Sequence, residues 1–138
     1  MIDQLKKNMF IGIGLMSMTK ERVREFGRKL AEDSKLSEAE GEKLVENAAE
    51  RGAAFMDKLR KIRSRHIKQV RGRGLLIGVE LYPAAGGARR FCEELMKEGL
   101  LCKETHENVI RFAPPLIIRD KDLNWALKRI KAVFKRLA

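Results

Sequence analysis

The spacing of apolar residues changes along the chain, and this change constrains the fold more than any other feature. Between residues 38 and 62, apolar residues recur every three or four positions, which predicts a long amphipathic helix over 38–64. From Val70 to Pro83 the spacing shortens to every second position, with residues 77, 79 and 81 on one face, which predicts a strand. The chain therefore joins a helical first part to a second part that contains strands.

The first part, residues 1–62, carries further helical signals. Apolar residues from Ile2 to Ile13 share one helix face, and Thr19 is a predicted cap of a second helix. Ser37 and Glu40 have the spacing of a capping box, which predicts the start of the long helix. Two amphipathic helices with a tight joint predict an antiparallel helical hairpin.

The second part, residues 63–138, alternates between strand and helix patterns. The expected elements are a strand within 70–83, a helix along 88–98 stopped by Gly99, strands at Leu100–Lys103 and Val109–Phe112 joined by a tight turn at 105–108, and a last helix capped by Asp120. This order predicts an α+β fold in which helices cover one face of a small, mostly antiparallel sheet. We expect the N-terminal helical hairpin to pack against this sheet.

The positive charge is concentrated in the second part. The chain carries 30 Lys and Arg against 19 Asp and Glu, a net charge of +11. Residues 1–62 hold 13 basic and 11 acidic residues, whereas residues 63–138 hold 17 basic and 8 acidic ones. Such an excess attracts phosphates and acidic surfaces. With one Trp and one Tyr available for stacking on bases, no specific binding of nucleic acid is expected.

Several kinds of site are disfavoured by residue spacing. The glycines of Gly72-x-Gly74 precede a strand, whereas a dinucleotide loop follows one, so a bulged strand start is the better interpretation. No serine lies in a nucleophile elbow, and no catalytic residue is assigned. The soft metal ligands, which lack metal-site spacing, are His66, Cys92, Cys102 and His106. No metal is expected, and Cys92 is predicted to be a packed thiol.

Location is predicted from the cysteines and from hydropathy. Two cysteines do not form the framework of a secreted domain, which favours the cytoplasm. The apolar stretch from Met9 to Met16 is shorter than the roughly 18 residues that span a bilayer. No transmembrane segment is therefore expected.

Residues 66–136 closely resemble the C-terminal segment of class III aminotransferases that depend on pyridoxal phosphate, above all the ornithine branch. The matching stretches are Val70–Leu81, Gly99–His106 and Val109–Leu116, the last being the most specific. The resemblance implies a small domain beside an active site, with Arg111 pairing with a substrate carboxylate, as suits a planar bidentate donor. It also implies that the catalytic lysine and the phosphate cup belong to a large domain. No lysine here lies in a matching motif, so no cofactor and no transamination are expected from this chain alone.

Residues 1–62 resemble short phasin-like proteins of polyhydroxyalkanoate granules. The similarity lies in Met1–Leu15, Met18–Glu21 and Lys35–Lys43. It implies helices that self-associate and coat an apolar granule surface, for which an amphipathic helix has suitable physics.

Together the two resemblances predict a fusion or chimera, natural or engineered, of a phasin-like segment at 1–62 and a small-domain module at 63–138. The expected function is a non-catalytic structural module that forms homo-oligomers. The first alternative is a fragment of an ornithine-type aminotransferase that retains weak binding of pyridoxal phosphate or a carboxylate substrate. The second is a granule- or lipid-associated protein.

Overall fold

The computed structural model describes residues 21, 24–25, 28–29, 32–33 and 37–138. The predicted helix face from Ile2 to Ile13 and the predicted cap Thr19 lie outside these residues. The elements are α3 (Glu38–Arg60), β1 (Ile67–Arg73), β2 (Leu76–Leu81), the short 3-10 helix η2 (Pro83–Ala85), α4 (Arg89–Lys97), β3 (Lys103–Thr105), β4 (Val109–Phe112) and α5 (Asp120–Arg136).

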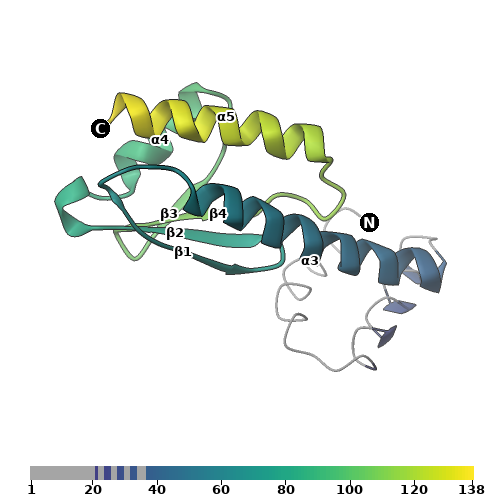
Figure 1. Cartoon of the computed structure of the whole chain (residues 1–138). Coiled ribbons are helices and arrows are strands. Elements are labelled where there is room, and N and C mark those ends of the chain that lie inside the picture. The colour runs from purple at the N-terminus through teal and green to yellow at the C-terminus, as the bar shows by residue number, and fades with distance from the viewer. Residues whose placement is uncertain (1–20, 22–23, 26–27, 30–31, 34–36) are drawn as a thin grey trace.

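The four strands form one antiparallel sheet in the order β1-β2-β4-β3. Helices α3, α4 and α5 lie on one side of it (Figure 1). Successive side chains of a strand point to opposite faces, so one face of each strand meets the helices and the other faces away from them. The predicted α+β fold, with a helix-covered antiparallel sheet, is confirmed.

The core lies between the sheet and the three helices. Ile77, Val79 and Leu81 of β2 alternate with more exposed residues and are at most 1% exposed, as their period of two predicts. The same buried cluster includes Ile110 and Phe112 of β4, Phe55 and Leu59 of α3, Phe91 and Leu95 of α4, and Ile130 and Phe134 of α5. One continuous cluster thus joins α3 to the second part of the chain.

Helix α3 begins at the predicted capping box. The Ser37 hydroxyl accepts a hydrogen bond from the Glu40 amide at 3.2 Å, and the Glu40 carboxylate accepts one from the Ser37 amide at 2.7 Å. Further along, Gly52 packs against the backbone of Gly74 so closely that a Cβ at residue 52 would lie 3.0 Å from the Gly74 Cα. Helix α3 is therefore fitted to the β1–β2 turn as well as to the core.

The segment predicted as a single strand at 70–83 belongs to a hairpin of two strands, so the predicted number of strands was wrong. Arg73 pairs with Leu76, which leaves a two-residue turn of Gly74 and Leu75. The φ of Gly74 is +54°, while Leu75 is not among the residues of positive φ. Glycine at the first central position is typical of a type II′ hairpin turn. Gly74 therefore belongs to a reversal of the chain, not to a bulged strand start.

Three other boundaries differ from the predictions, and the first is the end of α3, which lies at Arg60 and not at the predicted residue 64. Gly99 has a φ of +88° directly after α4, as expected for a glycine stop. The third strand begins at Lys103, where the expected strand ends, because it pairs with β4 only from that residue. Asp120 is the first residue of α5, not its cap; the cap position is Arg119, without a side-chain cap bond.

Candidate anion-binding face

Arg111 lies on the face of the sheet that no described helix covers. It is on β4, whose Ile110 and Phe112 point into the core, so the alternation of the strand directs Arg111 to the opposite side. The residue is half-buried. Within the described part of the chain, its guanidinium makes no hydrogen bond or ion pair. A planar cation with five donors is thus available for a ligand.

The sheet register places two more cations level with Arg111. Lys103 of β3 is its direct partner on one side, Gly78 of β2 is its partner on the other, and Arg71 of β1 pairs with Gly78. We call Arg71, Gly78, Arg111 and Lys103 the basic row. Paired residues of an antiparallel ladder project from the same face, so Arg71 and Arg111 flank a glycine that has no side chain, and Lys103 lies on the far side of Arg111.

One carboxylate shares this face, and it is already paired. Glu80 accepts hydrogen bonds from Arg71 and, at 3.2 Å, from Lys68. These two cations, Arg71 first, hold the pKa of Glu80 below its usual value. Glu80 therefore balances the charge of β1, and the charges of Arg111 and Lys103 stay uncompensated by it.

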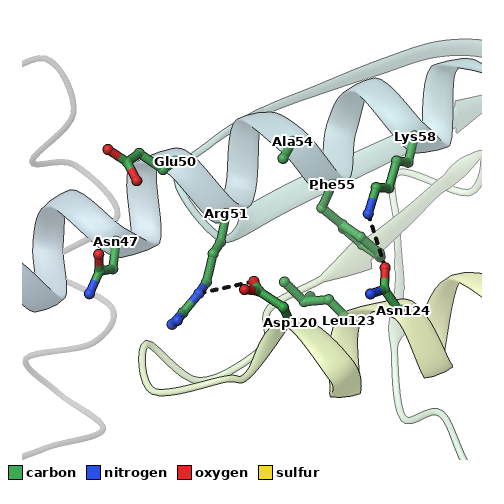
Figure 2. A pocket seen from close by; sticks show the side chains of 9 residues that line it. All are labelled: Asn47, Glu50, Arg51, Ala54, Phe55, Lys58, Asp120, Leu123 and Asn124. Atoms are coloured by element: carbon green, nitrogen blue, oxygen red, sulfur yellow. Dashed lines mark hydrogen bonds and ion pairs between the residues drawn. The ribbon is translucent and has the colours of Figure 1, made fainter.

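A hollow lies between α3 and the start of α5 (Figure 2). Arg51 donates to the Asp120 carboxylate at 3.2 Å and to the Ile118 carbonyl at 2.9 Å, while Lys58 donates to Asn124 at 2.9 Å. The charged groups that cross the hollow bond to groups of the protein itself. These contacts connect α3 to α5. The residues that line the hollow do not include a base beside a nucleophile.

The residues considered as metal ligands have other surroundings. His66 is buried, with Nε2 2.9 Å from the Leu137 carbonyl and its ring edge-on to Phe91. His106 is exposed in the β3–β4 turn, where its φ is +50°. Among the described residues, no group of three His, Cys, Asp or Glu side chains could hold a metal ion.

Sequence reasoning missed a contact between the two cysteines. The Cys102 thiol donates to the Cys92 sulfur; this hydrogen bond lowers the pKa of Cys92 and raises that of Cys102. Both side chains are partly buried against the core, so the predicted packing of Cys92 is confirmed. The available signal was that Cys92 lies on α4 and Cys102 directly precedes the strand beside it.

The described residues do not fit pyridoxal phosphate by themselves. The coenzyme forms a Schiff base with a lysine whose amine is desolvated and oriented. Every lysine in the described ranges is exposed to solvent. What this part of the chain offers is cationic binding of an anion, without a reactive amine.

The fold agrees with the comparison to known families. A model of the family described as "Aminotransferase class-III" matches residues 28–134, more than half of the chain. The chain therefore belongs to the class-III aminotransferases.

Two curated relatives of the chain are ornithine aminotransferases. The chain is 57% identical over 96 residues to the ornithine aminotransferase of Bacillus subtilis, covering 70% of this chain and 23% of that protein. A Geobacillus ornithine aminotransferase is 58% identical over 93 residues, covering 67% of this chain and 23% of the relative. The chain thus spans about 23% of the length of these relatives.

Solved structures give the same result. The ornithine aminotransferase of Toxoplasma gondii has a TM-score of 0.66 at 37% identity, covering 72% of this chain and 24% of that one. An acetylornithine aminotransferase from Elizabethkingia anophelis also has a TM-score of 0.66, at 33% identity, covering 73% and 27% of the two chains. The aminotransferase resemblance predicted from the sequence is confirmed.

The aminotransferase similarity extends into the first part of the chain. Residues 63–138 number only 76, so the 93-residue match to the Geobacillus relative takes in at least 17 residues before position 63. The family match begins earlier still, at residue 28. The comparisons give no support to a phasin-like segment or to a chimera, and both stay predictions. In the described ranges, no helix is both long and apolar enough to cross a membrane.

Proposed function

We propose that this chain supplies the small-domain part of an ornithine-type aminotransferase that depends on pyridoxal phosphate, and that Arg111 binds a carboxylate of the substrate. This proposal is the first alternative predicted from the sequence, and the ligand proposed for this chain is the carboxylate substrate. The family match over residues 28–134 and the names of the relatives support the assignment of the class.

The observation that carries the proposal is the unpaired guanidinium of Arg111. Half-burial and the flanking strands restrict the motion of the side chain, while no described carboxylate bonds to it. Arginine binds a carboxylate through two parallel hydrogen bonds, which fixes the orientation of the ligand as well as its charge. The residue's role is therefore to bind and orient a substrate, with the reactive amine supplied from outside the described residues.

A segment exchange tests this proposal. Residues 37–138 replace the aligned segment of the Bacillus subtilis ornithine aminotransferase, and KM for 2-oxoglutarate is measured with Arg111→Gln and with Lys131→Gln. Lys131 is exposed on α5 and is the matched control, because it loses the same charge on the helix-covered side. Loss of a charge-assisted hydrogen bond of about 1.5–3 kcal/mol predicts a 10- to 150-fold rise in KM for Arg111→Gln alone. Equal KM values for the two variants would remove Arg111 from the proposal.

Self-association also remains part of the proposal. Leu101 is 86% exposed and Ile117 is 72% exposed, which is unusual for large apolar side chains on a finished surface. We expect light scattering to show a mass above that of one 15.8 kDa chain. A monomer across the micromolar range would contradict this expectation.

A further inference from the structure

The two cysteines of the chain meet between α4 and the segment that enters β3. Cys92 is on α4, and Cys102 directly precedes Lys103, the first residue of β3. Both thiols are free, and the Cys102 thiol donates a hydrogen bond to the Cys92 sulfur. Packing against the core explains why both side chains are partly buried. It does not require the two sulfurs to lie against each other.

A second contact, which involves no sulfur, gives the same alignment of α4 with β3. Arg89, three residues before Cys92, lies 4.0 Å from Glu104, two residues after Cys102. Three helical residues rise about 4.5 Å, and two extended residues span about 6.6 Å. Residues 102 and 104 also project from the same side of an extended chain. The ion pair and the contact between the sulfurs are therefore neighbouring steps along one helix–strand interface.

The backbone at Cys102 is free to adjust. Pairing of β3 with β4 begins only at Lys103, so Cys102 lies outside the ladder. The residues before it form an exposed turn, in which Gly99 has a positive φ and the Leu101 side chain faces solvent. A disulfide brings two sulfurs from hydrogen-bond contact to about 2.05 Å. This turn can absorb the change without breaking the sheet.

We propose that Cys92 and Cys102 form a redox-modification site, at which a peroxide produces a reversible intramolecular disulfide in the folded chain. The inference goes beyond the proposed function and does not depend on it, because neither Arg111 nor an aminotransferase substrate takes part.

The oxidation takes place in two steps. The Cys92 thiolate attacks one oxygen of hydrogen peroxide, the O–O bond breaks, and Cys92 becomes a sulfenic acid while hydroxide leaves and takes up the proton lost by the Cys92 thiol. The Cys102 sulfur then attacks the Cys92 sulfur; an S–S bond forms, the S–O bond breaks, and the hydroxyl group leaves as water with the Cys102 proton. Two thiols and one peroxide give one disulfide and two waters, and two electrons pass from the sulfurs to the peroxide. A small dithiol reverses the reaction by thiol–disulfide exchange and is itself oxidised.

The hydrogen bond gives the two cysteines different roles. It lowers the pKa of Cys92, the sulfur that must be a thiolate to attack the peroxide. Donation to Cys92, burial and the charge of Cys92 raise the pKa of Cys102, which therefore keeps its proton during the first step. The first and the last of these causes disappear when Cys92 becomes a neutral sulfenic acid. Cys102 is then the attacking sulfur of the second step.

The test treats the reduced 138-residue chain with one molar equivalent of hydrogen peroxide at neutral pH, blocks the remaining thiols and digests the chain with trypsin. Trypsin cuts after Arg90, Lys97 and Lys103, so the cysteines fall in the separate peptides 91–97 and 98–103. We expect mass spectrometry to find these two peptides joined and lighter by two hydrogens than their sum, and dithiothreitol to separate them. A disulfide between two chains, or a sulfinic acid at Cys92 as the main product, would overturn the proposal.

Thermal unfolding shows whether the disulfide suits the native fold. A link that closes the short loop from residue 92 to residue 102 is expected to raise Tm by roughly 5–15 °C. An unchanged or lower Tm of the joined product would overturn the proposal, because the link would then require a distorted fold.

The variant Cys102→Ser is the matched control. Its Cys92 is expected to stop at the sulfenic acid, which dimedone traps, and peroxide is expected to leave its Tm unchanged. The same variant controls for oxidation of methionines such as Met96, which lies in the peptide of Cys92. If peroxide raised the Tm of Cys102→Ser as much as that of the wild type, the disulfide would not be the cause and the proposal would fail.

Discussion

Replacing Gly52 by alanine changes the stability of the fold through two effects of opposite sign, helix propensity and steric overlap. In the interior of a helix, alanine is more favourable than glycine by roughly 0.5–1 kcal/mol, so helix propensity alone predicts stabilisation. Gly52 lies inside α3, where the backbone of Gly74 approaches it. An added Cβ would overlap the carbonyl carbon and oxygen of Gly74 and lie 3.0 Å from its Cα.

The steric effect outweighs the gain in propensity. The atoms that the new methyl group meets are backbone atoms of the β1–β2 turn, so no side-chain rotation relieves the overlap. Helix α3 or the turn must move, which separates Phe55 and Leu59 from their neighbours in the core. Overpacking of this kind costs about 1–3 kcal/mol, so we expect a net loss of roughly 0.5–2 kcal/mol for Gly52→Ala.

Urea unfolding followed by far-ultraviolet circular dichroism measures this loss. Ala53→Gly is the matched control, because residue 53 is the exposed neighbour on the same helix and reports propensity alone. It should destabilise the fold by up to about 1 kcal/mol. A Gly52→Ala variant more stable than the wild type would refute the close approach of α3 to the turn.

Two further predictions concern ionisable groups. Cys92 should be alkylated by iodoacetamide faster than Cys102 at neutral pH, because the Cys102 thiol donates to the Cys92 sulfur and lowers the pKa of Cys92. The substitution Cys102→Ala should slow the alkylation of Cys92. Equal alkylation rates of the two cysteines, measured by mass spectrometry of the peptides, would contradict the contact. Lys97 and Arg136 lower the folded-state pKa of Glu94 below its usual 4.5, so its contribution to stability is complete above that pH and disappears as pH falls through the lowered value. Glu94→Gln should therefore flatten the acid loss in unfolding free energy between about pH 6 and pH 3, and an unchanged profile would count against the ion pairs.

Local signals in the sequence predicted the parts of the fold that depend on neighbouring residues. The capping box at Ser37 placed the start of α3, and Gly99 placed the end of α4, because each acts through bonds or dihedral angles within a few residues. Alternation predicted β2, since half of its side chains enter the core. Strand β1 was missed as a separate strand because Val70 is its one buried residue, so no alternation of apolar residues marks it.

The site depends on register, which a single sequence does not reveal. Arg111 was identified through a resemblance, but its neighbours come from positions 71, 78 and 103, on three other strands. The hydrogen bond between Cys92 and Cys102 was missed for the same reason, since it depends on how α4 meets the segment before β3.

The boundary drawn near residue 62 followed a change in apolar spacing, whereas the core cluster and the similarity to the relatives both continue across that residue.

The most direct measurement of the central claim is the rate of ornithine transamination by the exchanged enzyme, in which residues 37–138 replace the aligned segment of the Bacillus subtilis relative. The two segments are similar enough that the same core and the same sheet face should form, since the identity is 57% over 96 residues. We predict a rate of the same order as that of the parent enzyme, with the coenzyme absorbance retained. A soluble, folded exchange enzyme that binds the coenzyme but does not transaminate ornithine would contradict the account.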